Sequence, residues 1–304
     1  MNRFVSYVLL FVLLAACAPK PLPGGDGAPD AGVPDFAHIV LIVLENKGFE
    51  TVVGNPLMPN LNRLAQEYTL LTDYHAIRHP SLPNYLSLIG GDTFGIDSDC
   101  TDCFIDARTL PDLIEASGRT WKTYQEDMPA PCFVGDQGEY YQKHNPFMYF
   151  DSIRLDPGRC EQGVVPLTAL PQDIEAGSLP DFIFITPNIC NDAHSCSLET
   201  ADTWLAGLLA ELIPALEADA AGEPYLLVIM FDEAQKTNLL RRLLEPGGGR
   251  VPVILYSPLV KKGFEDPTFY NHYSLLKTIS VSWGLDYLGH AADSRTHLIS
   301  APWE

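Results

Sequence analysis

Three largely apolar segments constrain the fold of this chain more than any other feature. They are His38–Leu44, Asp181–Thr186 and Tyr225–Phe231, and all three are rich in aliphatic or aromatic residues. Strands that are buried on both faces have this pattern, and such strands occur in parallel sheets covered by helices. Segments with helical spacing separate them. The alternation predicts an α/β fold, a three-layer sandwich with a mostly parallel central sheet.

The remaining elements follow from periodicity and turn residues. Further strands are expected at Thr69–Tyr74, Thr120–Tyr124 and Val251–Tyr256. Helices are expected at Leu57–Tyr68, Tyr85–Ile89, Thr109–Ala116, Thr200–Ala218 and His272–Trp283. The chain contains no internal repeat, no Gly-x-Gly-x-x-Gly motif and no P-loop.

The first 35 residues are interpreted as a targeting segment and a tether. Arg3, a short apolar run and Leu14-Ala15-Ala16-Cys17 are typical of a lipoprotein signal peptide over residues 1–17. Cys17 would be lipidated and would anchor an exported bacterial lipoprotein to a membrane, in the periplasm or at the cell surface. An ordinary signal peptide that contains a cysteine is the alternative. Residues 18–35 form a Pro/Gly-rich linker, and residues 36–304 form one domain.

The six cysteines after Cys17 predict disulfides, because an even number in an exported protein usually forms them. Their spacing does not fix the pairing, but short loops favour Cys100–Cys103, Cys132–Cys160 and Cys190–Cys196. A zinc site at the Cys-x-x-Cys is the alternative, and the chain has no second such motif. The Cys-rich region at about 92–165, and residues 127–165 above all, are expected to form a long, disulfide-pinned excursion near the active face.

The formal net charge of −20 limits the possible partners. It argues against a nucleic-acid surface and against electrostatic attraction to anionic lipid. It also repels phosphorylated substrates at long range, so an enzyme that acts on phosphate would need a local cation.

Polar residues follow the apolar strands at the points where the strands end. They are Glu45 and Asn46, then Asn188 with Asp192, then Asp232 and Glu233. The carboxyl ends of parallel strands lie at one edge of a sheet, so these side chains are expected to converge there. Gathered carboxylates repel each other, and a bound cation removes that cost. Oxygen ligands suit Mg²⁺, Ca²⁺ or Mn²⁺ better than zinc. The alternative is that these acids cap the following helices.

Ser81 stands between Pro80 and Pro83, before an apolar helical run. Pro83 fits the first turn of a helix, which places Ser81 at or just before a helix N-terminus. Free backbone N–H groups there favour an anion, so a serine could attack phosphorus and leave the phosphoryl oxygens on those donors. The alternative is a serine that only caps the helix.

At this point the chain resembles a known family. Five motifs carry the resemblance, in this order: Glu45-Asn46-Lys47, His79-Pro80-Ser81-Leu82-Pro83-Asn84-Tyr85, Ile185-Thr186-Pro187-Asn188-Ile189-Cys190-Asn191-Asp192, Phe231-Asp232-Glu233 and Asn271-His272-Tyr273-Ser274. They look like the bacterial acid phosphatase and phospholipase C-type phosphoesterases of the alkaline phosphatase superfamily. The resemblance implies a phosphoseryl intermediate on Ser81 and a metal held by Glu45, Asn46, Ser81, Asp232 and Glu233.

The resemblance also assigns roles to single residues. Asn84 matches an asparagine that contacts a phosphoryl oxygen in related phosphodiesterases. Two departures concern a second metal site: Gly247-Gly248-Gly249-Arg250 stands where many relatives have a histidine, and Ala234–Leu244 is rich in leucine and arginine. Arg250 is expected either to bind substrate phosphate or to pair on the surface.

The remaining candidates are histidines and polar residues of the motifs. His194 and His272 are expected to be catalytic, with His194 protonating the leaving group or binding metal. His79 is a weaker candidate, and His75, His144, His290 and His297 have no assigned role. Asn188 and Asp192 are expected to bind substrate.

The sequence therefore favours a metal-dependent phosphoesterase, more of the acid phosphatase kind than a phospholipase C-type phosphodiesterase. Its partner would be a small phosphorylated substrate or a phospholipid headgroup. A sulfatase is disfavoured by Tyr85, where the sulfatase motif has arginine, and an acyl-serine hydrolase by the lack of Gly-x-Ser-x-Gly. A non-catalytic binding lipoprotein is the alternative from another class.

Overall fold

The computed structural model of the chain describes residues 32–235 and 247–303. The expected signal peptide with Cys17 and most of the expected linker lie outside the described residues, as does most of Ala234–Leu244.

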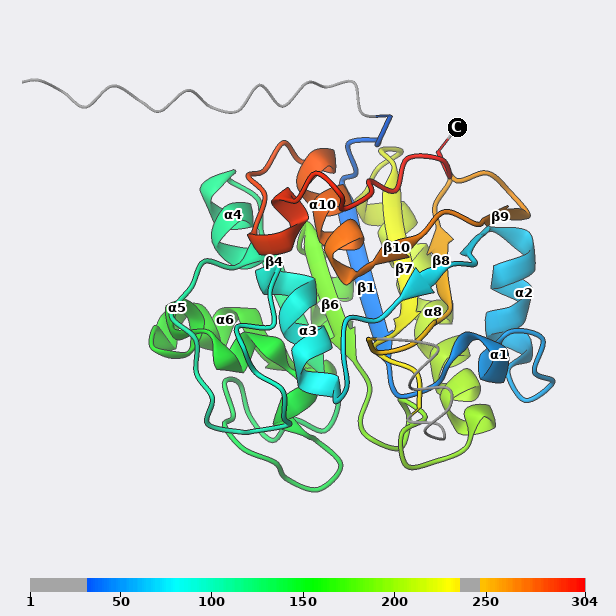
Figure 1. Cartoon of the computed structure of the whole chain (residues 1–304). Helices are drawn as coiled ribbons and strands as arrows, with labels where there is room; N and C mark the ends of the chain where they lie inside the picture. Colours follow the sequence, from blue (N-terminus) through cyan, green and yellow to red (C-terminus); the bar gives the residue numbers. More distant parts are fainter. Residues whose placement is uncertain (1–31, 236–246, 304) are drawn as a thin grey trace, which may run out of the picture.

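An eight-stranded, mostly parallel sheet runs through the structure, as the alternating pattern predicts (Figure 1). In spatial order its strands are β5 (Val164–Pro166), β4 (Trp121–Gln125), β6 (Phe182–Thr186), β1 (His38–Leu44), β7 (Tyr225–Phe231), β8 (Val253–Tyr256), β2 (Thr69–Leu71) and β9 (Phe264–Asp266). Strand β8 is antiparallel to both neighbours, and the other neighbouring pairs of the described sheet are parallel. A second, two-stranded sheet pairs β3 (Tyr74–His75) with β10 (Tyr270–Asn271).

The centre of the sheet explains why its sequence is apolar throughout. Every residue of β1, β6 and β7 is buried. Strands β1 and β7 pair in register from His38–Tyr225 to Leu44–Phe231. The two strands therefore end level with each other, and Glu45 and Asp232 leave the sheet as neighbours.

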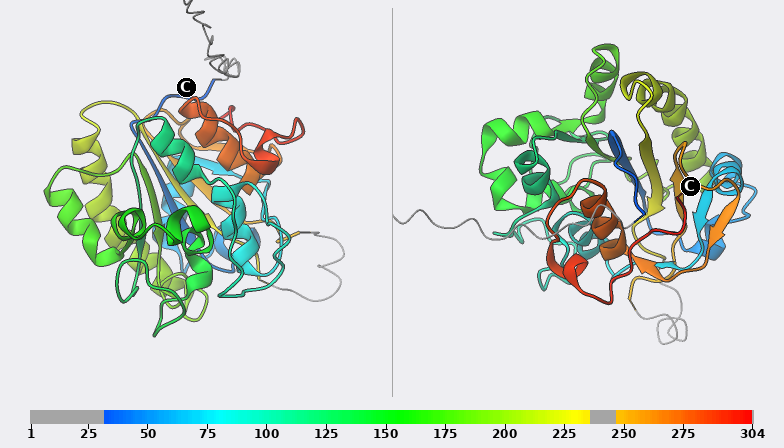
Figure 2. Two further views of the ribbon diagram at one scale, coloured as in Figure 1. Left: turned by 90° about the vertical axis from the view of Figure 1, so that its left-hand side faces the viewer. Right: turned by 90° about the horizontal axis from the view of Figure 1, so that it is seen from above.

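Helices cover both faces of the sheet. They are α1 (Phe49–Val52), α2 (Pro59–Glu67), α3 (Ser81–Gly90), α4 (Leu110–Ala116), α5 (Asp151–Arg154), α6 (Pro157–Gly163), α7 (Leu170–Glu175), α8 (Leu198–Asp219) and α10 (His272–Ser282). Helices α3 and α10 pack together on one face, and α2 and α8 pack together on the other (Figure 2). None of the helices in the described part of the chain is both long and apolar enough to cross a lipid bilayer.

The region 127–165 is more ordered than the sequence suggests. Besides α5, α6 and β5 it contains two 3₁₀ turns, η1 (Gln142–His144) and η2 (Pro146–Tyr149). Phe147 is fully buried and stacks on Trp121, with the ring centroids 5.3 Å apart. The disulfide Cys132–Cys160 ties the two ends of the segment together, and Lys143 from η1 lines the pocket beside Ser81.

The three disulfides favoured by loop length are confirmed: Cys100–Cys103, Cys132–Cys160 and Cys190–Cys196. The alternative of a zinc site at Cys100 and Cys103 is thereby excluded, because both sulfurs are bonded to each other.

Candidate active site

Ser81 is the first residue of α3, and its hydroxyl faces the carboxyl edge of the sheet. The side chain is buried, and Oγ donates a hydrogen bond of 2.9 Å to Oε2 of Glu45. Pro80 precedes it in extended conformation as the N-cap residue, and Pro83 lies within the first turn of the helix. The structure thus brings together the serine and the strand-end carboxylate, as the convergence argument expects.

Near Ser81 lie two buried carboxyl groups, each with one oxygen that accepts no hydrogen bond from the described residues. Glu45 and Asp232 have no solvent exposure. The backbone N–H of Asn46 donates to Oδ1 of Asp232 at 3.0 Å, while Oδ2 of Asp232 and Oε1 of Glu45 accept no hydrogen bond from the described residues. Burial and the charge of Asp232 raise the pKa of Glu45 well above its ordinary value, and burial and Glu233 do the same for the pKa of Asp232.

This donor set fits a hard divalent cation in its chemistry. Buried oxygens without partners are costly, and an ion between them would satisfy both. The amide of Asn46 and the hydroxyl of Ser81 add two further neutral oxygen donors beside the carboxylates. No three His, Cys, Asp or Glu side chains in residues 32–235 and 247–303 are arranged as a ready metal site.

His144, which has no role assigned from the sequence, lies in this buried cluster. It is buried, its Nε2 lies 3.2 Å from Oε1 of Glu45, and its Nδ1 lies 3.3 Å from Oδ2 of Asp192. Its ring stacks on Tyr85 at 5.5 Å between centroids. The two contacts of the imidazole nitrogens are distances between polar atoms and not hydrogen bonds, because Nε2 of His144, Oε1 of Glu45 and Oδ2 of Asp192 have no hydrogen-bond partner among the described residues. Burial raises the pKa of Asp192 to about 8.

Ser81 opens into a pocket of about 370 Å³. Four residues expected at the site line it: Asn46, Ser81, His194 and Glu233. The other lining residues are Lys47, Pro80, Asp99, Lys143 and Gln235. Lys47 and Lys143 are the local cations that an acidic protein needs beside a phosphate site.

The charges of the pocket residues follow from their surroundings. Burial lowers the pKa of Lys143, but the carboxylates of Glu45 and Asp99 raise it more, and the pKa ends above its ordinary value. Burial, together with the charge of Lys143, lowers the pKa of His194 to about 4, so its imidazole is neutral except in acidic solution. The carboxylate of Glu233 contacts Nδ1 of His79.

Asn84, for which the resemblance implies contact with a phosphoryl oxygen, is not among the described residues that line the pocket. Its Oδ1 accepts hydrogen bonds from the backbone N–H groups of Ile77 and Arg78, and its Nδ2 donates to the carbonyls of Arg78 and Pro80. The side chain is fully buried. Because all these bonds go to the segment before Ser81, Asn84 holds that segment in place.

The glycine run at residues 247–249 also contacts the segment before Ser81, through backbone hydrogen bonds to Ala76. The N–H of Gly248 donates to the carbonyl of Ala76, and the N–H of Ala76 donates to the carbonyl of Gly249. A Cβ on Gly248 would lie 2.6 Å from the carbonyl oxygen of Arg78, so this close approach requires glycine.

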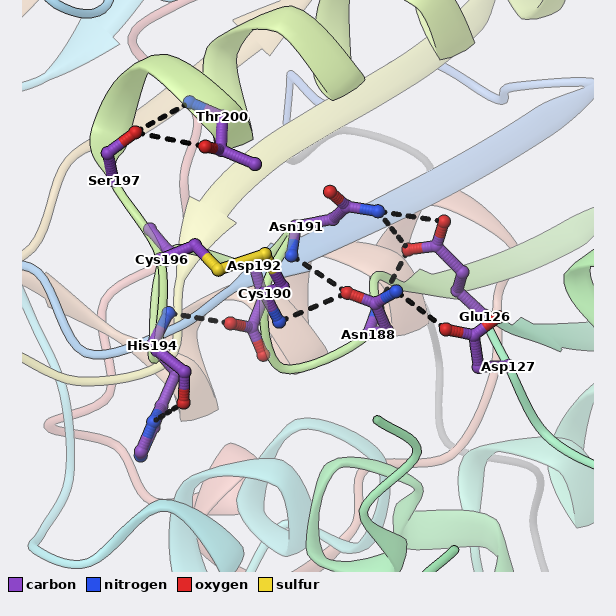
Figure 3. Close-up of a disulfide and its surroundings, with 12 residues drawn as sticks. Glu126, Asp127, Asn188, Cys190, Asn191, Asp192, His194, Cys196, Ser197 and Thr200 are labelled. Carbon is purple, nitrogen blue, oxygen red and sulfur yellow. Dashed lines mark hydrogen bonds between the residues drawn. A yellow bond between two sulfur atoms is a disulfide. The ribbon is translucent and has the colours of Figure 1, made fainter. Parts of the chain in front are cut away.

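Asn188 and Asp192 organise a loop instead of lining the pocket (Figure 3). Oδ1 of Asn188 accepts from the N–H groups of Cys190 and Asn191, and its Nδ2 donates to Asp127. Oδ1 of Asp192 accepts from the N–H of His194 at 2.7 Å. The expected direct contact with substrate is not supported for either residue, because their polar atoms are turned toward the loop closed by Cys190–Cys196 and toward His144.

His272 and Arg250 also lie outside the pocket lining. His272 is fully buried, where its Nε2 donates to the carbonyl of Asp232 at 2.8 Å and its Nδ1 accepts from the hydroxyl of Tyr74 at 3.2 Å. The guanidinium of Arg250 donates to Glu50 and to the carbonyl of Thr72. For Arg250 this agrees with the alternative that it pairs on the surface, because both terminal nitrogens of its guanidinium donate hydrogen bonds within the protein.

The fold of the chain can be compared with those of solved proteins. The chain is similar to a solved protein of the alkaline phosphatase superfamily from Vibrio parahaemolyticus, with a TM-score of 0.59 and 12% identity over 86% of this chain and 71% of that one. It is also similar to a phosphonate monoester hydrolase from Silicibacter pomeroyi, with a TM-score of 0.52 and 11% identity over 86% and 75% of the two chains. These likenesses show the alkaline phosphatase-like fold.

Within that fold class, the profile of the Phosphoesterase family matches residues 55–286, and the chain belongs to this family. A phosphate-repressible acid phosphatase of Penicillium chrysogenum is 37% identical over 84% of this chain, and the chain spans 60% of that relative's length. A phosphatidylinositol-3-phosphatase of Mycobacterium tuberculosis is 31% identical over 88% of this chain and 84% of the relative.

Proposed function

We propose that this protein is a metal-dependent phosphoric ester hydrolase of the acid phosphatase kind, with Ser81 as its nucleophile. The observation that carries the proposal is the Ser81 hydroxyl, which lies 2.9 Å from the buried carboxylate of Glu45 and opens into a pocket with two lysines. The relatives named as acid phosphatases and as a phosphatidylinositol-3-phosphatase support the same reaction class.

In the proposed reaction, Oγ of Ser81 gives its proton to water as it attacks phosphorus, the bond from phosphorus to the ester oxygen breaks, and the alcohol leaves with a proton. Water then breaks the bond between phosphorus and Oγ, which releases phosphate and restores the serine. Glu45 orients the hydroxyl by accepting its hydrogen bond. His194, on the pocket wall, would donate the proton to the leaving group in acidic solution. A divalent cation held by Glu45, Asn46, Asp232 and Glu233 would lower the pKa of the serine and neutralise phosphoryl charge.

Hydrolysis of p-nitrophenyl phosphate by the purified protein tests the proposal. Ser81→Ala is expected to lower kcat by about a thousandfold or more, because the covalent route is lost. Ser87→Ala is the matched control, since Ser87 lies buried on the same helix and donates to the carbonyl of Pro83. A chelator is expected to remove activity, and added metal to restore it. A non-catalytic binding protein predicts no hydrolysis at all, and activity that survives in Ser81→Ala would refute the nucleophile.

We also propose that the protein is exported and anchored through a lipidated Cys17, on the basis of the signal sequence. Mass spectrometry of the mature N-terminus from a bacterial membrane fraction would detect the lipid. Release of wild-type protein in the soluble fraction, indistinguishable from Cys17→Ser, would refute the anchor.

A further inference from the structure

Two lysines share the pocket with Ser81 in a chain whose net charge is −20. Lys47 follows β1 directly after Glu45 and Asn46, and Lys143 lies in η1. The side chain of Lys143 is only 14% exposed. A partly buried ammonium is costly unless anionic groups compensate it, so the position of these charges calls for an explanation.

Each ammonium is held in place by one hydrogen bond to a described residue. Nζ of Lys47 donates to the carbonyl of Ala193 at 2.7 Å, and Nζ of Lys143 donates to Oδ2 of Asp99 at 3.2 Å. An ammonium has three N–H donors. The pocket side of both groups therefore has donors to offer a ligand.

Asp99 ties Lys143 to the helix that carries the nucleophile. Its Oδ1 accepts the backbone N–H of Leu82 at 3.1 Å, in the first turn of α3, while Oδ2 binds Lys143. The position of Lys143 relative to Ser81 is thus set by one carboxylate. The backbone position of Lys47 is fixed by the preceding residue, Asn46, whose N–H donates a hydrogen bond to Asp232. Besides Asp99, the other carboxylate that lines the pocket is Glu233, which contacts His79.

We propose that Lys47 and Lys143 form a subsite for phosphoryl oxygens that selects phosphate monoesters over diesters. The proposal rests on the phosphoric ester hydrolase activity proposed above and names its substrate class. A monoester has three terminal oxygens and carries up to two negative charges, whereas a diester has two terminal oxygens and one charge. With one oxygen on the side of the pocket lined by Asn46 and Glu233, a monoester offers one further anionic oxygen to each lysine. A diester leaves one ammonium facing an ester oxygen.

The test compares two esters with the same leaving group, p-nitrophenyl phosphate and bis(p-nitrophenyl) phosphate. In Lys143→Gln and in Lys47→Gln, kcat/KM for the monoester is expected to fall by about tenfold or more, with a much smaller change for the diester, because each loses one charge-assisted hydrogen bond to the dianion. The inhibition constant of inorganic phosphate is expected to rise in parallel. Lys143→Arg keeps the charge and is expected to retain most of the preference for the monoester.

Lys122→Gln is the matched control. Lys122 also makes one close ion pair, to Asp173 at 2.7 Å, and its side chain is 23% exposed, but it lies away from the Ser81 pocket. Equal losses on both esters, or no loss on the monoester, would overturn the subsite. If one glutamine variant fails to fold, as judged by thermal unfolding, the kcat/KM values of the other glutamine variant and of Lys143→Arg on the two esters still test the subsite. A wild-type protein that hydrolyses neither ester would refute the proposed function itself.

Discussion

The hydroxyl of Ser81 donates a hydrogen bond of 2.9 Å to Oε2 of Glu45, a residue 36 positions earlier in the chain. The contact exists because β1 ends at Leu44 and α3 begins at Ser81 at the same edge of the sheet. Glu45 is buried, so its carboxylate has few alternatives to this bond and holds Oγ in one direction. This fixed position at a helix N-terminus is what the proposed nucleophile requires.

Divalent metal is expected to stabilise the protein through Asp232. Mg²⁺, Ca²⁺ or Mn²⁺ at a hundred times its dissociation constant should raise the free energy of unfolding by about 2.7 kcal/mol. Asp232→Asn should remove most of this gain, because it neutralises a carboxylate whose Oδ2 accepts no hydrogen bond from the described part of the chain. Thermal unfolding with chelator and with added metal measures the effect. Asp266→Asn is the control, since Asp266 is also buried at a strand end but accepts the hydroxyl of Tyr270. An equal gain in Asp232→Asn would contradict the proposed ligand.

Asn84→Ala is expected to lower kcat with little change in KM, and to destabilise the fold by roughly 2–4 kcal/mol, since its hydrogen bonds to the loop before Ser81 are lost. Steady-state kinetics and urea unfolding provide the two readouts. Asn62→Ala serves as the control, because Asn62 is likewise buried and hydrogen-bonded to backbone, but in α2. It should lose stability and keep kcat. A large rise in KM for Asn84→Ala without loss of stability would instead indicate contact with the phosphoryl group.

His272 is expected to make stability depend on pH. Burial lowers its pKa to about 4 from an ordinary 6.5, so between these pH values the unfolded chain binds a proton that the native protein does not. This contribution is absent above pH 6.5, and it destabilises the native state progressively as the pH falls toward 4. The full loss is roughly 3 kcal/mol.

Urea unfolding in the presence of chelator, at several pH values from 7 to about 4, measures this slope. His272→Gln should lack this part of the pH dependence, whereas His297→Gln, at an exposed position, should keep it. Identical slopes for the wild type and His272→Gln would show that the imidazole is protonated in the native state.

The sequence was a good guide to the parts of the fold whose signals are local. Strands β1, β6 and β7 were predictable because residues buried on both faces must all be apolar. The three disulfides followed from short loops. The edge strand β9 and the packed turns η1 and η2 were not predicted, since their burial depends on distant partners such as Trp121.

The same division holds for the site. That Ser81, Glu45 and Asp232 meet could be expected, because parallel strands bring their ends to one edge. His144 and Lys143 could not be found this way, since η1 reaches the site through the packing of the Cys-rich region. Asn84, Asn188 and His272 do not line the pocket, because their polar atoms bond to backbone groups and to the side chains of Asp127 and Tyr74.

By itself, the sequence determined the apolar strands and the polar residues at the strand ends, because both are patterns of neighbouring residues, and it favoured the disulfide pairings without fixing them. Only the tertiary structure decided which polar atoms face the pocket and which support it. The physical reason is that a buried polar side chain must find partners, and those partners come from segments far away in the chain.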